Sequence, residues 1–144
     1  MSYWQLYYHI TWATLERQPL LLATFEAKLH RFLVTKAKDM GLTVHAVNSM
    51  PDHVHLAVSI PPNIAVAECI GQLKGSSSHT INRSIPDISI KWQRGYGVVS
   101  FRQEQLPDIV AYIQRQKEHH TTKNVINSME YESNDEHGPL AWPD

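Results

Sequence analysis

The chain has 144 residues, of which 42% are hydrophobic, so its length fits one domain with an ordinary core. Its one cysteine excludes an internal disulfide, and no apolar run approaches the roughly 20 residues that would cross a bilayer. The first residues lack the pattern of a signal peptide, so we expect a cytoplasmic protein with no membrane partner.

The net charge of −1 hides an uneven distribution. Residues 1–73 carry five basic and five acidic residues, residues 74–123 carry eight basic and four acidic, and residues 124–144 carry five acidic and no basic. The middle segment is compatible with a DNA-binding face, although ordinary scatter gives a similar excess. We expect one domain over 1–123 and an acidic, flexible tail over 124–144.

Hydrophobic periodicity alternates between 2 and 3.6 residues and predicts seven elements. In chain order these are a strand over 3–13, a helix over 22–40, strands over 43–50 and 53–60, a helix over 64–83, a strand within 88–101 and a helix from about Pro107. Gly41 marks a helix end, and Pro51-Asp52 marks a tight turn between two strands. Gly71 and Gly75 weaken the prediction of the second helix.

The order βαββαβ followed by one more helix is typical of a ferredoxin-like α+β fold. We expect an antiparallel sheet with two helices on one face and a C-terminal helix that carries Tyr112. Successive residues of a strand point to opposite faces, so His53 and His55 lie opposite the apolar residues of strand 53–60. Because the apolar set must face the two helices, the histidines lie on the open face, which is left for the additional helix.

Four residues on this face could carry metal chemistry. His53 and His55 are alternate residues of one strand, roughly 6 to 7 Å apart, which lets two imidazoles converge on one ion. Tyr112 and Gln116 share one face of a helix, and the amide oxygen of Gln116 favours Mg²⁺ or Mn²⁺ over zinc. A nearby cation helps a phenol with a pKa of about 10 to ionise. The pattern predicts metal-dependent cleavage of single-stranded DNA with Tyr112 as the nucleophile.

Each feature also has an ordinary explanation. Alternating histidines on a strand are more often surface residues than ligands, and a tyrosine beside Ile109 and Ile113 is usually a packing residue. A kinked helix explains the stretch from Lys74 to Ser78 better than a phosphate cradle does, and an ordinary turn explains Trp92–Gly97 nearly as well as single-strand binding does.

The motifs together resemble those of the single-tyrosine HUH transposases of small insertion sequences, including the repeat-associated tyrosine transposases. They occur in the order found in that family and cover nearly the whole chain as far as about Asn124. The matching stretches are HITW at 9–12, PDHVHL at 51–56, LKGSSS at 73–78, WQRGYG at 92–97 and YIQRQKEHH at 112–120.

This resemblance implies that His53, His55 and Gln116 bind the metal and that Tyr112 forms a 5′-phosphotyrosine and frees a 3′-hydroxyl. Members of the family recognise hairpins near element ends, use no ATP and work as dimers, often with the tyrosine helix serving the partner's histidines. A homodimer with active sites completed in trans is therefore expected. Further DNA contacts are expected at His9, Lys74, Arg94, Tyr96, Arg115, His119 and His120.

Two other functions are compatible with the fold. One is a non-catalytic DNA- or RNA-binding regulator derived from a transposase, and the other is a structural metal protein. The joint presence of His53, His55, Tyr112 and Gln116 argues against the regulator, because an inactive descendant has no reason to keep all four.

Overall fold

The computed structural model describes residues 2–117, and the structural statements below concern that part of the chain. Its elements alternate as the periodicity predicts. They are β1 (Tyr7–Ala13), the 3₁₀ turn η1 (Leu15–Arg17), α1 (Ala23–Asp39), β2 (Thr43–Met50), β3 (His53–Ser59), α2 (Val66–Ser84), β4 (Gly97–Phe101), the 3₁₀ turn η2 (Gln103–Gln105) and α3 (Leu106–Gln114). None of these helices is long and apolar enough to span a membrane.

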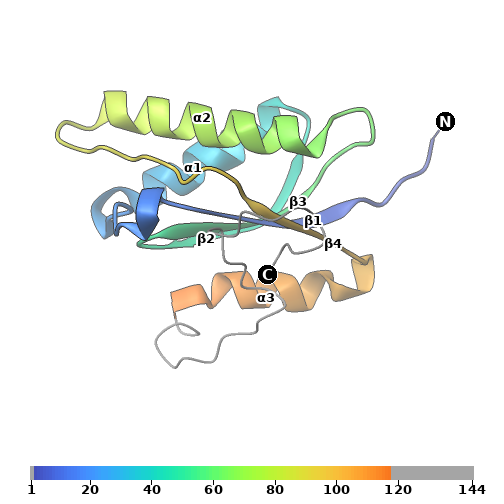
Figure 1. Ribbon diagram of the computed structural model, residues 1–144. Helices are drawn as coiled ribbons and strands as arrows, with labels where there is room; N and C mark the ends of the chain where they lie inside the picture. Colours follow the sequence, from blue (N-terminus) through green and yellow to red (C-terminus); the bar gives the residue numbers. More distant parts are fainter. Residues whose placement is uncertain (1, 118–144) are drawn as a thin grey trace.

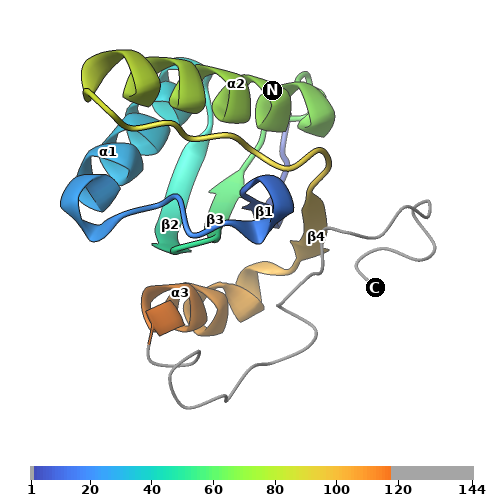
Figure 2. The same cartoon turned by 60° about the vertical axis from the view of Figure 1, so that its left-hand side comes forward.

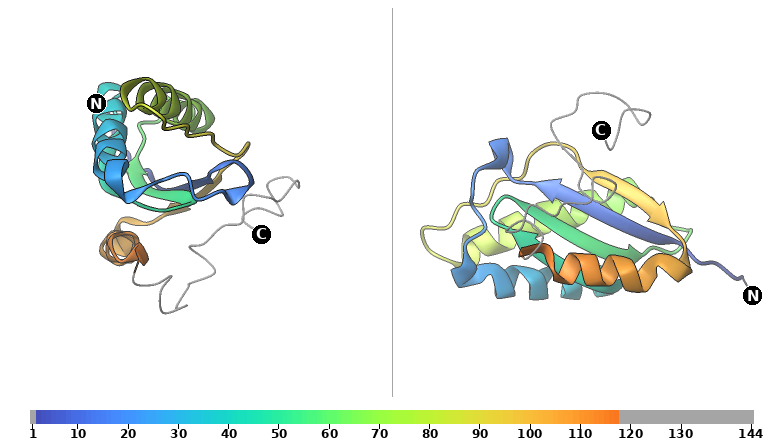
Figure 3. Two further views of the ribbon diagram at one scale, coloured as in Figure 1. Left: turned by 90° about the vertical axis from the view of Figure 1, so that its left-hand side faces the viewer. Right: turned by 90° about the horizontal axis from the view of Figure 1, so that it is seen from below.

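The strands form one antiparallel sheet in the order β2-β3-β1-β4. Helices α1 and α2 cover one face and α3 lies against the other, so the molecule has three layers (Figures 1 and 2). Seen along the strands, the sheet separates the pair of helices from the single one (Figure 3). The predicted ferredoxin-like fold with an added C-terminal helix is confirmed.

The main core lies between the sheet and the two helices. Each strand contributes the residues of one face, and each helix contributes its apolar stripe. The fully buried members include Ile10, Trp12, Leu29, Leu33, Val54, Leu56, Ile70, Leu73 and Ile81. The sequence analysis expected Gly71 and Gly75 to weaken α2, but the helix is continuous through both. Both glycines lie on its exposed side, and the buried residues on its other side stabilise it.

Element boundaries differ from the predictions at two strands. The first begins at Tyr7 instead of residue 3, and the last is only Gly97–Phe101 within the window 88–101. Backbone pairing sets the start of the first strand and the length of the last, because β1 pairs with β4 only from Tyr7 to Thr11. The hydrophobic pattern does not reveal this pairing. Gly41 ends α1 with a φ of +86°, as expected for a glycine helix terminus.

Candidate active site

The face of the sheet that α3 covers carries three histidines. His53 and His55 come from β3 and His9 from the neighbouring β1, where Thr11 pairs with His55 and Ala13 with His53. Because side chains alternate along a strand, all three rings project away from the main core. They are nonetheless buried, with 2% (His9), 5% (His53) and 0% (His55) of their surface exposed.

The two β3 histidines lie close enough to act together. Their ring centroids are 5.0 Å apart and their planes are inclined by 69°. The sequence prediction that alternate positions bring two imidazoles together is consistent with this geometry. As expected, the histidines lie on the face opposite α1 and α2, and the additional helix lies there too: α3 packs on β2 and β3 and leaves His55 fully buried.

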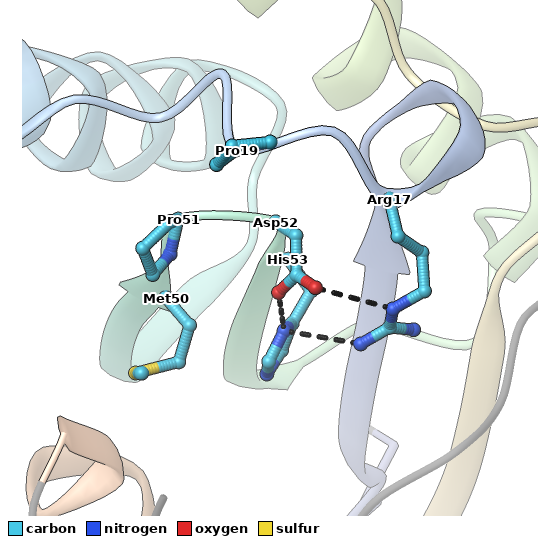
Figure 4. A pocket seen from close by; sticks show the side chains of 6 residues that line it. All are labelled: Arg17, Pro19, Met50, Pro51, Asp52 and His53. Carbon is cyan, nitrogen blue, oxygen red and sulfur yellow. Dashed lines mark hydrogen bonds and ion pairs between the residues drawn. The ribbon is translucent and has the colours of Figure 1, made fainter. Parts of the chain in front are cut away.

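Asp52, in the turn before β3, contacts the first of these rings. Its Oδ1 lies 2.6 Å from His53 Nδ1, and its Oδ2 accepts a hydrogen bond of 3.3 Å from Arg17 Nε (Figure 4). Burial raises the pKa of Asp52, but the hydrogen bond from His53 and the charges of His53 and Arg17 outweigh it and lower the pKa to about 2. The carboxylate is therefore ionised at neutral pH.

His9 makes the corresponding contact with the second ring. His9 Nε2 and His55 Nδ1 are 2.9 Å apart, and the ring centroids are 5.1 Å apart. One nitrogen of this pair donates the hydrogen and the other accepts it. The DNA contact expected at His9 stays a prediction, but in this structure the ring faces His55 inside the protein.

Tyr112 faces the histidines from α3. Its side chain is 3% exposed, and its ring centroid lies 6.1 Å from that of His55 with the planes inclined by 74°. Pro107, in the first turn of α3, suits a helix start. The prediction that Gln116 lies on the same helix is wrong, because α3 ends at Gln114 and the backbone of Arg115 is no longer helical. Gln116 lies just beyond the helix and is completely buried.

Polar contacts that the sequence analysis missed fix the end of α3. Asn48 Nδ2 donates to the carbonyl of Ile113 at 2.9 Å. Lys117 Nζ donates to the carbonyl of Ser49 at 3.0 Å and to Glu26 Oε1 at 2.8 Å. These bonds join α3 to β2 and α1. No motif reveals them, because they depend on where the helix docks.

The donors on this face fit a divalent metal. Within residues 2–117, no group of three or more His, Cys, Asp and Glu side chains is placed to hold an ion. A site built on His53 and His55 therefore needs a ligand of another type, and the amide oxygen of the buried Gln116 is one. Two imidazoles and one amide would leave positions for phosphate oxygens.

An open pocket adjoins His53. It has a volume of about 470 Å³ and is lined by Arg17, Pro19, Met50, Pro51, Asp52 and His53. Figure 4 shows His53 and Asp52 between the apolar side chains and the guanidinium of Arg17. The pocket gives solvent and ligands access to the His53 end of the otherwise buried site.

The other expected DNA contacts are scattered in the structure. Lys74 lies partly buried on α2 and donates to the carbonyls of Gln93 and Gly95, at 2.8 and 2.7 Å, so it supports the segment before β4. Arg94 and Arg115 are exposed, and Tyr96 packs against the main core. His119 and His120 lie outside the described residues, as does the tail over 124–144. These contacts stay predictions.

Comparison with known proteins identifies a family. A model described as "Transposase IS200 like" matches residues 2–116. The chain is 29% identical over 119 residues to the ISDra2 transposase TnpA of Deinococcus radiodurans, which covers 78% of this chain and 85% of that protein. It is 27% identical over 101 residues to the transposase for insertion sequence element IS200 of Salmonella typhimurium, which covers 66% of each.

Solved structures share the fold. One, assigned as a transposase of Deinococcus radiodurans R1, has a TM-score of 0.64 at 27% identity and covers 81% of this chain and 95% of its own. A REP-associated tyrosine transposase bound to a REP hairpin has a TM-score of 0.62 and covers 83% of this chain and 74% of its own. At 19% identity, the second likeness concerns the fold alone.

Proposed function

Because this chain belongs to the IS200-like transposase family, we propose that it cuts and rejoins single-stranded DNA through a covalent bond to Tyr112. The observation that carries the proposal is the position of this phenol. Its ring contacts that of His55, and Gln116, just after the end of the same helix, is completely buried. Tyr112 also packs with the buried apolar residues Ala57, Ile109 and Ile113, so the contact with His55 is the feature that distinguishes it from a packing residue.

In the proposed cleavage, the phenolic oxygen of Tyr112 attacks the phosphorus of one phosphodiester. A bond forms between these two atoms, and the bond from phosphorus to the 3′-oxygen breaks. The phenol loses its proton and the 3′-oxygen gains one. The 5′ end stays on Tyr112 as a phosphotyrosine, which keeps the bond energy, so a 3′-hydroxyl can attack the phosphorus and rejoin the strand without ATP.

The burial of Tyr112 has a chemical consequence. A phenol that is 3% exposed has little water around it to stabilise the negative charge that develops on its oxygen during the attack. A divalent metal held by His53, His55 and Gln116, for which we propose Mg²⁺ or Mn²⁺, would supply positive charge to the phosphate oxygens and to the developing phenolate. The pocket beside His53 offers the DNA strand a path to this end of the site.

For the substrate, we propose DNA hairpins at the ends of a mobile element. The likeness to a transposase bound to a REP hairpin supports this choice, together with membership of the transposase family. The excess of basic residues within 74–123 is compatible with it. DNA binding without any covalent product would instead favour a regulator derived from a transposase.

For the assembly, we propose a homodimer in which each α3 serves the histidines of the other subunit. In this structure α3 packs on β2 and β3 of its own chain, and a helix from a second copy could make the same contacts by exchange. Mixing Tyr112→Phe with His55→Ala subunits tests the exchange. A mixed dimer with sites in trans has one intact site and regains cleavage, whereas sites in cis stay inactive.

The activity itself is tested with end-labelled single strands taken from the DNA that flanks the gene. With Mg²⁺ present, a denaturing gel should show a shortened strand and a band that migrates more slowly until protease is added. EDTA should abolish both. Equal cleavage with and without EDTA would exclude the metal, and the absence of a protease-sensitive band would exclude the covalent step.

A further inference from the structure

Both histidines of the proposed metal site have the nitrogen nearer the backbone engaged by another side chain. Asp52 contacts Nδ1 of His53, and His9 contacts Nδ1 of His55. We propose that Asp52 and His9 are positioning residues that hold both imidazoles in the tautomer with hydrogen on Nδ1, so that both Nε2 atoms present a lone pair to the metal. This inference rests on the function proposed above.

For His53, the contact itself decides the tautomer. An ionised carboxylate can only accept hydrogen bonds, so a separation of 2.6 Å from Asp52 Oδ1 places a hydrogen on His53 Nδ1. Arg17 Nη2 lies farther from this nitrogen, at 3.4 Å. Because a guanidinium only donates, it cannot be the acceptor of the hydrogen on Nδ1, and Asp52 is that acceptor. With the hydrogen on Nδ1, the neutral ring carries its lone pair on Nε2. Metal-bound histidines commonly have this arrangement.

The carboxylate of Asp52 is held in place from the other side. Arg17 Nε donates to Oδ2, which leaves Oδ1 directed at His53. Arg17 has a backbone φ of +52°, in the left-handed region that side chains other than glycine rarely adopt. Two bonds tie its segment to the turn before β3, from Thr14 N to Asp52 O at 2.9 Å and from Leu21 N to Pro51 O at 3.0 Å. These bonds fix the position of the Asp52 carboxylate relative to His53.

For His55, the contact leaves two arrangements. If His9 Nε2 donates, His55 Nδ1 accepts, so the neutral His55 ring carries its single ring hydrogen on Nε2 and cannot bind a metal through that atom. If His55 donates from Nδ1 to His9 Nε2, the lone pair of His55 Nε2 is available. Only the second arrangement suits the proposed site. It requires the neutral His9 ring to carry its hydrogen on Nδ1, so His9 acts as an acceptor inside the protein.

Two measurements on the full chain test this inference without any DNA. Long-range ¹H–¹⁵N NMR spectra of the metal-free protein report which nitrogen of each ring carries hydrogen, with peaks assigned through His53→Gln and His55→Gln. Titration with Mn²⁺ gives the affinity of the site. The wild type should show hydrogen on Nδ1 of both rings and should bind Mn²⁺.

Removing each acceptor should change one ring. Asp52→Ala should leave His53 as a mixture of tautomers and weaken Mn²⁺ binding by about 10- to 100-fold. Asp52→Asn should restore part of both, because its amide oxygen can still accept from Nδ1. His9→Phe should alter His55 in the same way, with His9→Gln as the variant that keeps an acceptor. Asp39→Asn, on the exposed end of α1, should change neither measurement.

The outcomes separate this inference from the proposed function. Unchanged tautomers and Mn²⁺ affinity in Asp52→Ala would overturn the role of Asp52, even if the wild type cleaves DNA. Hydrogen on Nε2 of His55 in the wild type would overturn the role of His9. If the tautomers and affinity respond as expected but no strand is ever cut, the positioning residues stand and the proposed reaction fails. A wild type that binds no Mn²⁺ would overturn both.

Discussion

The two faces of the sheet use the same strands for different purposes. On the face toward α1 and α2, β1 and β3 bury Ile10, Val54 and Leu56 in an apolar core. On the face toward α3, the intervening positions bury His9, His53 and His55. Burying apolar surface stabilises the fold directly, whereas buried polar groups cost free energy unless they are hydrogen-bonded.

This difference shows how one short strand can carry both stability and chemistry. All residues of β3 from His53 to Val58 are buried, yet neighbouring side chains meet different surroundings. The apolar face tolerates exchange among hydrophobic residues of similar volume. The face toward α3 buries a smaller apolar cluster that includes Ala57 and Ile113, and its polar groups depend on specific partners, such as Asp52 for His53. Substitutions on the two faces should therefore affect different measurements.

The largest effect is expected at the proposed nucleophile. Tyr112→Phe should lower strand cleavage by at least about 10⁴-fold, because the attacking oxygen is absent. The free energy of unfolding should change by no more than about 1 kcal/mol, because the ring is kept. Cleavage kinetics and urea denaturation measure the two effects. Cleavage that survives would redirect attention to another tyrosine, such as Tyr96.

A pair of neighbouring substitutions on β3 compares the two faces directly. Leu56→Ala should lower the free energy of unfolding by about 2 to 5 kcal/mol, because it opens a cavity in the main core. His55→Ala should cost less stability but should abolish Mg²⁺-dependent cleavage. Denaturation and cleavage at a temperature where both variants are folded make the comparison. The α3 face also has an apolar cluster around Ala57 and Ile113, so equal stability losses would mean that His55 contributes to packing as much as Leu56 does.

The docking of α3 offers a smaller effect. Lys117→Met removes the bonds to Glu26 and to the carbonyl of Ser49, so the residues just after α3, which include Gln116, should lose their fixed position. Misplacement of about 1 Å can slow catalysis by up to about 10²-fold. We expect slower cleavage with little change in unfolding. Lys38→Met, on the exposed end of α1, is the matched control and should cleave normally.

On the opposite side of the sheet, Gly71→Ala should stabilise the protein by about 0.5 to 1 kcal/mol. Gly71 lies on the exposed side of α2, and a Cβ there would meet no atom within 4 Å. Cleavage should not change, because α2 lies in the other layer. Thermal unfolding measures the gain, and a loss of stability would mean that the helix needs the freedom of this glycine.

The smallest effect concerns pH. Burial lowers the pKa of His30, a shift that Lys117 reinforces and Glu26 opposes, and its ring is bonded to Ser49 Oγ at 2.8 Å. In the unfolded chain, His30 binds a proton near its ordinary pKa of 6.5, more readily than in the folded protein. The free energy of unfolding should therefore fall as the pH drops from about 7 through the lowered pKa. His30→Gln should reduce this slope in denaturation measured across the range. If the pH dependence of the free energy of unfolding is unchanged in His30→Gln, it arises from other histidines.

Sequence patterns predicted the fold well because each element is defined locally. The periodicity of α1 and the alternation in β3 come from neighbouring residues, and Gly41 and Pro51-Asp52 mark their ends. The same local spacing brought out His53 and His55 as one pair and Tyr112 and Gln116 as another. The structure brings Tyr112 of the second pair against His55 of the first only through the docking of α3.

The supporting contacts could not be predicted in this way. The bond between His9 and His55 depends on the register of two strands, 46 residues apart in the chain. Arg17, in a segment with a left-handed backbone, reaches Asp52 across 35 residues of the chain. The periodicity predicted a helix on the histidine face, but how completely it buries His55 depends on where α3 docks. The PDHVH stretch already contained Asp52, but no spacing rule assigned it a partner.

The most direct test of the central claim is to locate the covalent bond. The wild type is incubated with Mg²⁺ and a flanking single strand labelled at either end, the product is digested with protease and nuclease, and the peptides are analysed by mass spectrometry. The account predicts a nucleotide on Tyr112, linked through the 5′-phosphate, together with a free 3′-hydroxyl on the other fragment. A nucleotide on a different residue, or a linkage through the 3′-phosphate, would contradict it.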